Sequence, residues 1–157
     1  MSAKGIRDID VIRTFVLQGT LNFTRYFFKI RQKRKFVIGK HHREIAAALD
    51  KVLCGEITRL IINIAPRYGK TELAVKNFIA EGLAINPKAK FIHLSYSDDL
   101  ARDNSRGVQD IINEPEYRRI FPATIPTSTN TKKWYTTEGG GLYAVSSAGQ
   151  VTGFGAG

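Results

Sequence analysis

The spacing of apolar residues changes several times along the chain, and each spacing predicts one element. In "HREIAAALDKVLCG" (42–55) apolar residues recur every three or four positions, which predicts a helix that ends at Gly55. "RLIINIA" (59–65) is short, apolar and β-branched, which predicts a buried strand. "TELAVKNFIAEGLAIN" (71–86) predicts a second helix, because Asn86 and Pro87 follow it as a stop signal.

The same alternation of strand and helix continues after Pro87. "AKFIHLSYS" (89–97) predicts another strand, since its apolar residues are bounded by turn residues. "DDLARDNSRGVQDIIN" (98–113) predicts a third helix, for which Ser97 and Asp98 are candidate N-caps. The resulting order of helix, strand, helix, strand and helix predicts an α/β fold with a parallel sheet and flanking helices.

The pattern changes once more after Pro115. "EYRRIFP" (116–122) predicts a short helical turn, and residues 123–133 form a polar, loop-like stretch. "WYTTEGGGLYAVSSAGQVTGFGAG" (134–157) alternates short apolar runs with glycine, which predicts a glycine-rich β-hairpin. The sequence then stops without a closing strand or helix, so we expect a fragment of a longer protein.

The N-terminal part combines aromatic and basic residues. Residues 1–20 give a weak helical signal, and residues 21–43 contain four phenylalanines, one tyrosine and eight Lys or Arg. One interpretation is a nucleic-acid surface, where cations meet phosphate and rings meet bases. The other is an amphipathic helix with Phe23, Phe27 and Ile30 on the core and its basic face in water.

Composition narrows the function classes. The chain has 24 Lys or Arg and 14 Asp or Glu, a net charge of +10, which favours polyanionic partners. No apolar run approaches the roughly 18–20 residues that a membrane-spanning helix needs, and the first residues do not form a secretory leader. Cys54 is the only cysteine, so an intrachain disulfide is excluded.

A candidate phosphate-binding loop lies between the predicted strand 59–65 and the predicted helix 71–86. Gly69 would let backbone N–H groups approach phosphate, Lys70 would reach the β and γ phosphates of ATP, and Thr71 would hold Mg²⁺. The helix that follows would point its positive end at the anion. The leading glycine of such loops is absent, because Ile64 stands at its position. The alternative interpretation is a basic turn that begins a helix.

Three further residues of this loop bear on its chemistry. Pro66 would make the sharp exit from the strand. Arg67, three residues before Lys70, would lie near the γ-phosphate and neutralise charge there, unless it forms a surface salt bridge. Glu72 is well placed for the dipole of the helix that it begins.

Several segments together resemble a known family. "IINIAPRYGKTE" (61–72), "HLSYSDDLARDNSRGVQDIINEPEYRRIFP" (93–122) and "KKWYTTEGGGLYAVSSAGQVTGFGAG" (132–157) are similar to the large terminase subunit of tailed bacteriophages. That protein is the ATP-driven motor that packages DNA into procapsids, and its phosphate loop has Pro-Arg-x-Gly-Lys-Ser/Thr in place of the glycine entry. The resemblance implies an incomplete P-loop NTPase fold, ASCE-type and RecA-like. It also implies an N-terminal helical and basic segment, 1–35, and a partial ATPase domain, 36–157, that ends before the Walker B strand and lacks the nuclease domain.

The resemblance also implies roles for individual residues. In "GKHHREI" (39–45), two histidines occupy positions where the family often has an aromatic residue and a glutamine that contact adenine; otherwise both face solvent at a helix N-terminus. Lys70 and Arg67 are the expected catalytic residues, and Thr71 is the expected Mg²⁺ ligand. The expected nucleotide-binding residues are Pro66, Arg67, Tyr68, Gly69, Lys70, Thr71, Glu72, His41 and His42.

The expected cofactors are ATP and Mg²⁺, and the expected partners are double-stranded DNA, the small terminase subunit and the portal protein. A homo-oligomeric ring in the cytoplasm of a bacterial host, without membrane contact, is expected of the full-length protein. By itself this chain would not package or cut DNA, because the resemblance implies that the Walker B strand, the coupling motif and the nuclease domain are missing from it. Asp98 and Asp99 follow a predicted strand, but they are better explained as helix caps than as Walker B acids. The alternatives are a basic nucleic-acid-binding module without nucleotide chemistry, and another P-loop enzyme such as a helicase-like ATPase or a small kinase.

Overall fold

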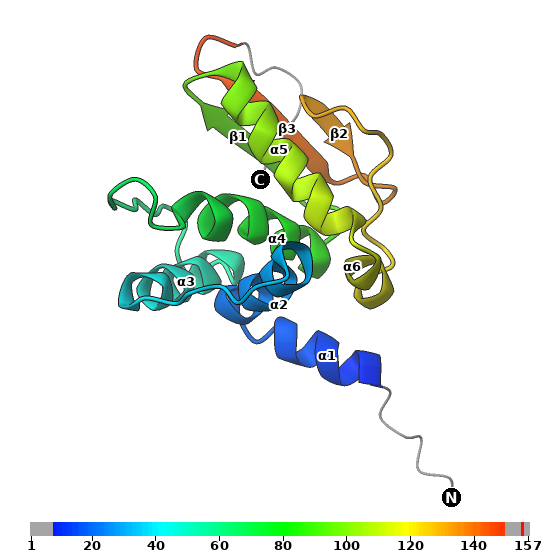
Figure 1. Cartoon of the computed structure of the whole chain (residues 1–157). Coiled ribbons are helices and arrows are strands. Elements are labelled where there is room, and N and C mark those ends of the chain that lie inside the picture. The colour runs from blue at the N-terminus through cyan, green and yellow to red at the C-terminus, as the bar shows by residue number, and fades with distance from the viewer. Residues whose placement is uncertain (1–7, 150–154, 156–157) are drawn as a thin grey trace, which may run out of the picture.

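The structure, a computed structural model, describes residues 8–149 and residue 155. Helices dominate the first half, and the strands follow Pro87 (Figure 1). In chain order the elements are α1 Asp8–Val16, α2 Thr20–Gln32, α3 Lys40–Leu53, the π-helical segment η1 Glu72–Asn77, α4 Phe78–Ile85, β1 Lys90–Ser95, α5 Asp98–Asn113, α6 Pro115–Ile120, β2 Lys133–Tyr135 and β3 Gly141–Ser146. None of the helices in the described part combines the length and the apolar character needed to cross a bilayer.

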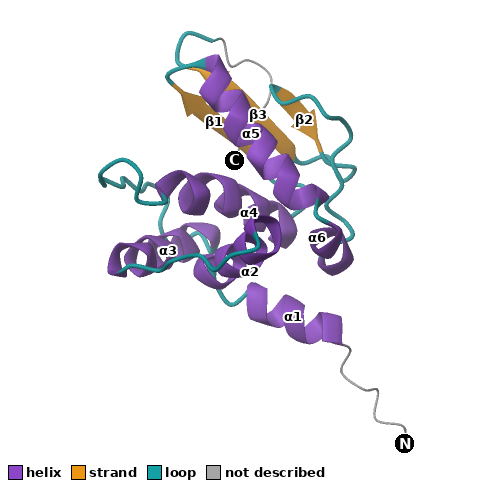
Figure 2. Ribbon diagram, in the orientation of Figure 1, coloured by secondary structure: helices purple, strands orange, loops and turns teal. Residues whose placement is uncertain are grey.

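The strands of the described residues form a mixed sheet in the order β1-β3-β2 (Figure 2). β1 and β3 are parallel, with Lys90 opposite Gly141 and Ser95 opposite Ser146. β2 runs antiparallel to β3 and places Trp134 opposite Leu142. The predicted β-hairpin and the α/β class are therefore confirmed over the described residues, whereas residues 150–154, 156 and 157 of the expected glycine-rich segment lie outside them. The sheet itself is mixed rather than parallel throughout.

The predicted strand over 59–65 is the main correction to the fold. Within the described residues, this segment pairs with no strand and belongs to no helix. Leu60, Ile62 and Ile64 are partly buried against the cluster around Ile45 and Leu73, while the residues between them are exposed. This period of two suits an extended chain. The apolar pattern predicted a buried strand, whereas only every second residue is partly buried, and a strand also needs a neighbour for its backbone groups.

The predicted helices are confirmed. Gly55, with φ +79°, follows the C-cap of α3, and η1 continues directly into α4 up to the stop at Asn86. The Ser97 hydroxyl caps α5 by accepting a hydrogen bond from Leu100 N at 3.2 Å. The Asp98 carboxylate does not cap the helix and instead accepts a bond from Ser146 N at 3.0 Å. It therefore fastens the start of α5 to the end of β3.

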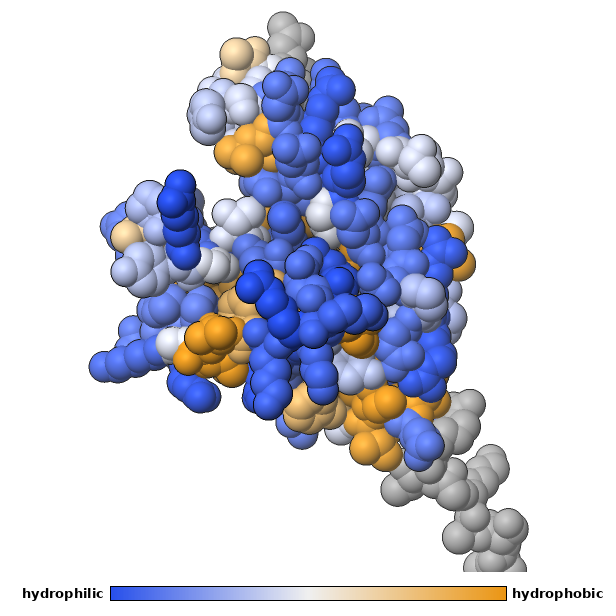
Figure 3. Space-filling view, viewed as in Figure 1, coloured by the Kyte–Doolittle hydropathy of each residue, from blue (hydrophilic) through white to orange (hydrophobic). Residues whose placement is uncertain are grey.

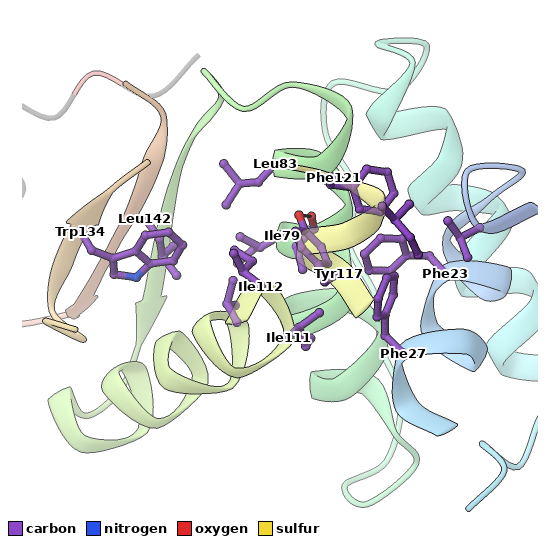
Figure 4. Packing of buried hydrophobic residues seen from close by; sticks show 14 residues of the cluster. Phe23, Phe27, Ile79, Leu83, Ile111, Ile112, Tyr117, Phe121, Trp134 and Leu142 are labelled. Carbon is purple, nitrogen blue, oxygen red and sulfur yellow. Dashed lines mark hydrogen bonds between the residues drawn. The ribbon is translucent and has the colours of Figure 1, made fainter. Parts of the chain in front are cut away.

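The core joins the helices to the sheet (Figure 4). Phe23 and Phe27 of α2 are fully buried against Tyr117 and Phe121, so the amphipathic-helix interpretation of this segment is confirmed. Trp134 of β2 lies at the other end of the same cluster. The other buried residues of this core are Val16, Ile79, Ala80, Leu83, Val108, Ile111, Ile112, Ile120 and Leu142. Residues from both sides of position 35 therefore contribute to one core.

Candidate nucleotide-binding site

The loop that leads into η1 projects from the body of the molecule, at the left of Figure 2. Its helical hydrogen bonding begins at Gly69, whose carbonyl accepts a bond from Leu73 N at 3.0 Å. The first amides of a helix have no partner within the helix, and together they form a positive, anion-binding end. The backbone N–H groups that follow Gly69 therefore face the loop in a position suited to phosphate.

Two residues of the loop have left-handed backbone conformations. Gly69 has φ +75°, and a Cβ atom at this position would lie 2.7 Å from Nε2 of His42, so only glycine fits. Arg67 has φ +68°, which is uncommon for a residue with a side chain and costs about 1–3 kcal/mol. Backbone strain of this kind is concentrated at binding sites. The loop thus keeps an unfavourable conformation that exposes its amides.

A concavity of about 430 Å³ lies on this loop. Its cationic members, Arg67 and Lys70, are both exposed, and in the described part of the chain neither one makes an ion pair. The salt-bridge interpretation of Arg67 is therefore not supported. Two uncompensated cations beside free helix amides favour an anion. The lining residues are Ala65, Pro66, Arg67, Gly69, Lys70, Thr71 and Glu72.

A second concavity, of about 490 Å³, adjoins the first and shares Arg67, Gly69 and Glu72 with it. Its other walls are largely apolar or aromatic. The Phe36 ring contacts the rings of Phe28 and His42 edge-on, at centroid distances of 5.1 and 4.9 Å. The remaining lining residues are Arg34, Lys35, Val37, Ile38, Gly39, His41 and Tyr68. The arrangement places an aromatic pocket beside a cationic one, as a nucleotide requires.

His42 connects α3 to the loop. Its Nδ1 accepts a hydrogen bond from Gly39 N at 2.9 Å, so the ring hydrogen is on Nε2, which donates to Tyr68 O at 2.8 Å. Burial lowers the pKa of His42 and the neighbouring His41 lowers it further, although the bond to Tyr68 opposes the change. A neutral imidazole therefore holds the backbone immediately before Gly69. The solvent-facing alternative is wrong for His42, which is buried.

His41 is only partly buried, and its ring contacts the ring of His42 in a tilted arrangement. The two histidine rings are 3.8 Å apart, and Tyr68 meets the His41 ring edge-on at 5.5 Å. His41 Nε2 lies 3.3 Å from Tyr68 O and 3.1 Å from His42 Nε2. His41 thus lines the aromatic concavity together with His42 and Tyr68.

Glu72 is held by residues that sequence reasoning missed. Its Oε1 accepts hydrogen bonds from Arg31 at 2.7 Å and from Asn77 Nδ2 at 3.0 Å. Asn77 Nδ2 also donates to Glu72 O at 2.8 Å, spanning the wide turn of the π-helix. Arg31 is 41 positions from Glu72, so no local pattern indicates the pair. The basic run around Arg31 was the only signal in the sequence.

The described residues contain no group of three or more His, Cys, Asp or Glu side chains able to hold a metal ion. Mg²⁺ in nucleotide sites takes only one or two protein ligands and fills its shell with phosphate oxygens and water, so a single hydroxyl such as that of Thr71 fits this role. His93, by contrast, hydrogen-bonds to Asn104 at 3.0 Å, and burial lowers its pKa. This partly buried histidine of β1 therefore has a structural partner and lines neither concavity of the loop.

Comparison of the chain with models of protein families, with curated proteins and with solved structures finds no match. A function for this protein therefore depends on the geometry of the loop and on its sequence motifs.

Proposed function

We propose that this chain binds Mg-ATP through residues 65–72, and that it is the N-terminal ATPase part of a phage DNA-packaging motor of the large terminase type. The observation that carries the nucleotide proposal is the concavity around Lys70. It combines two cations without ion pairs in the described residues, a glycine at φ +75° and the amino end of a helix. Such a combination suits a polyphosphate.

The triphosphate would lie against the backbone that follows Gly69. The Lys70 ammonium would contact the β and γ phosphates, and the Thr71 hydroxyl would contribute to the Mg²⁺ shell. Arg67 is exposed at the boundary of the two concavities, where its guanidinium could meet the terminal phosphate. There it would neutralise charge that develops during phosphoryl transfer.

The adenine base would occupy the aromatic concavity. Phe36 and His41 offer ring faces or edges, and Val37 and Ile38 complete an apolar wall. His42 has both ring nitrogens engaged by backbone groups, so it would position the loop rather than read the base. Pro66 and Tyr68 belong to the same loop, and the Tyr68 carbonyl accepts the hydrogen bond by which His42 holds this loop.

Binding without efficient hydrolysis is the expected behaviour of this chain. Hydrolysis needs a carboxylate to help hold Mg²⁺ and a group to orient water. Within the described residues, Glu72 pairs with Arg31 and Asp98 with Ser146 N. DNA translocation, the ring and the contacts to the small subunit and portal belong to this proposal for the full-length protein.

Isothermal titration calorimetry with Mg-ATP tests the nucleotide site. We expect saturable binding by the unmodified chain and a loss of at least about tenfold in affinity for Lys70→Ala, because one charge-assisted contact to phosphate contributes about 1.5–3 kcal/mol. Lys88→Ala is the matched control, since Lys88 is exposed and lies outside both concavities. Equal affinity of the two variants for Mg-ATP would refute the assignment.

Direct nucleic-acid binding is the second candidate function, and one observation favours it. Figure 3 shows hydrophilic side chains gathered over α2. The exposed basic residues are Arg25 and Lys29 on α2 and Lys33, Arg34 and Lys35 directly after it. Phe23 and Phe27 are buried and offer no rings to bases, so the exposed cations would bind mainly through the phosphate backbone. Such binding would weaken steeply with salt and would be unaffected by Lys70→Ala.

A further inference from the structure

An acidic cavity lies apart from the nucleotide site, between the start of α2, the end of α3 and the end of α4. In Figure 1, α2 and α3 lie side by side below α4, and α2 contacts both of the other helices. The cavity has a volume of about 320 Å³. Its main lining residues are Asp50, Glu81, Leu17, Leu53, Cys54 and Ile85. In a chain of net charge +10, two carboxyl groups in one cavity are unusual.

Asp50 already has one structural task. Its Oδ1 accepts a hydrogen bond from Thr20 N at 2.7 Å, so α3 caps the amino end of α2, where Gly19 has no side chain to do so. This bond fixes the Asp50 carboxylate at the wall of the cavity. It also means that the carboxylate stays close to Glu81 of α4.

Glu81 is faced by the Thr20 hydroxyl and has no backbone N–H partner like that of Asp50 among the described residues. Its side chain is 1% exposed, and within the described residues its Oε2 accepts or donates no hydrogen bond. Burial raises the pKa of Glu81 to about 8, the nearby Asp50 carboxylate adds to the rise, and the Thr20 hydroxyl opposes it. A buried carboxyl oxygen without a partner costs about 1–3 kcal/mol. The structure thus leaves one buried carboxyl oxygen without a hydrogen-bond partner, on a side chain that lines the cavity.

We propose that this cavity binds an alkylammonium group, which is the chemistry shared by a lysine side chain and a free aliphatic amine. The ammonium would lie between Glu81 and Asp50 and supply the donors that Oε2 lacks. Leu17, Leu53 and Ile85 would contact the aliphatic stem, as apolar surfaces do with lysine chains elsewhere. A bare metal ion fits less well, since the described residues hold no cluster of three ligating side chains.

Binding is linked to pH through Glu81. The groups that face it are Asp50 from α3, the Thr20 hydroxyl from α2 and Tyr117 from α6, whose phenol donates to Ala80 O at 2.7 Å. Cys54 lines the same cavity with a free thiol. Glu81 must lose its proton before it can pair with an ammonium, so affinity rises with pH up to about 8 and falls about tenfold per pH unit below it.

Titration with n-butylammonium, followed by NMR, tests the proposal. We expect saturable binding at pH 8.5, binding weaker by more than tenfold at pH 6.5, and no binding of n-butanol, which has the same stem without charge. Glu81→Gln keeps the shape of the protonated acid and should fold, yet it should reduce amine affinity at least tenfold and remove the pH dependence. Glu138→Gln, an exposed position on the turn before β3, should leave binding unchanged.

A second arm uses Nα-acetyl-lysine N-methylamide to distinguish the sources of the amine. Tighter binding of this compound than of butylammonium supports a lysine of a partner protein, and equal or weaker binding supports a free amine. The proposal would be overturned if butanol bound with the same affinity as butylammonium. It would also be overturned if a folded Glu81→Gln variant bound the amine with unchanged affinity. Circular dichroism and urea unfolding of the variant establish that it is folded.

Discussion

At the scale of single residues, the loop is defined by one glycine and one histidine. Gly69 has both a left-handed backbone and a neighbour, His42 Nε2, that fills the space where a Cβ would stand. Gly55, at φ +79°, has the same backbone constraint, but no atom lies within 4 Å of its Cβ position. A comparison of substitutions at the two glycines therefore separates the cost of a left-handed backbone from the cost of a steric clash.

Alanine substitution at both positions measures this difference. Gly55→Ala should destabilise the fold by roughly 1–2 kcal/mol, the cost of a left-handed conformation for a residue with a Cβ. Gly69→Ala should cost more, because its methyl group displaces His42, and it should also weaken Mg-ATP binding severalfold. Urea unfolding and calorimetry provide the two readouts. Equal stability of the two variants, with unchanged nucleotide affinity, would contradict the role assigned to Gly69.

The spacing of Gly69, Lys70 and Thr71 is a local signal, and from it the sequence predicts a phosphate-binding loop. The hydrogen bond from His42 to Tyr68 O could not be predicted, because nothing in the sequence indicates which of the two adjacent histidines is buried. The sequence predicts for both histidines either contact with adenine or exposure to solvent. A hydrogen bond between residues 26 positions apart depends on how α3 packs, which local patterns do not encode.

At the scale of elements, α2 and η1 are joined by the pair of Arg31 and Glu72. Their side chains are 10% and 17% exposed, and Arg31 Nη1 lies 2.7 Å from Glu72 Oε1. Lys76, at 4.0 Å from Glu72 Oε2, is a weaker second cation. Because Glu72 is the first residue of η1, this pair ties α2 to the start of the helix that follows the loop.

A double-mutant cycle with Arg31→Gln and Glu72→Gln measures the coupling. We expect an interaction of about 1–3 kcal/mol in urea unfolding, since both side chains are largely desolvated. Arg31→Gln alone should be the more damaging single change, because it leaves a buried carboxylate without its main partner. A coupling below about 0.5 kcal/mol would mean that the two helices are held together by apolar packing alone.

The elements differ in how far the sequence predicted them. α5 was predicted with its observed bounds, because Ser97 is a cap and the apolar residues have helical spacing, both local properties. The segment 59–65 was predicted as a strand from equally clear apolar spacing. Its backbone, however, has no paired neighbour within the described residues, and pairing is a property of the whole sheet. The π-helical start of the following helix gave no sequence signal.

At the scale of the whole molecule, the sheet presents an unpaired edge. β1 is bonded to β3 on one side, and its other side has no partner strand among the described residues. Leu94 of β1 is 57% exposed, and Tyr96 after it is 83% exposed. Open edges with apolar side chains promote pairing between molecules. Self-association is therefore expected in spite of the high net charge.

Leu94→Lys tests the role of this edge. A charged side chain on the exposed strand should weaken self-association severalfold, as natural edge strands illustrate. Val11→Lys on α1 is the matched control, since Val11 is 56% exposed and the change adds the same charge away from the sheet. Sedimentation velocity over a range of concentrations gives the readout. If both variants self-associated equally, the self-association would have to be assigned to a surface other than the edge of β1.

The central claim is that the backbone after Gly69 binds the phosphates of ATP. Titration of the isotopically labelled chain with Mg-ATP, followed through its amide NMR signals, tests this claim most directly. The largest shifts are predicted for the amides of Gly69, Lys70, Thr71 and Glu72, with smaller ones for His41 and Phe36. Shifts confined to α2 and the basic residues 25–35, with the amides of 69–72 unmoved, would contradict it.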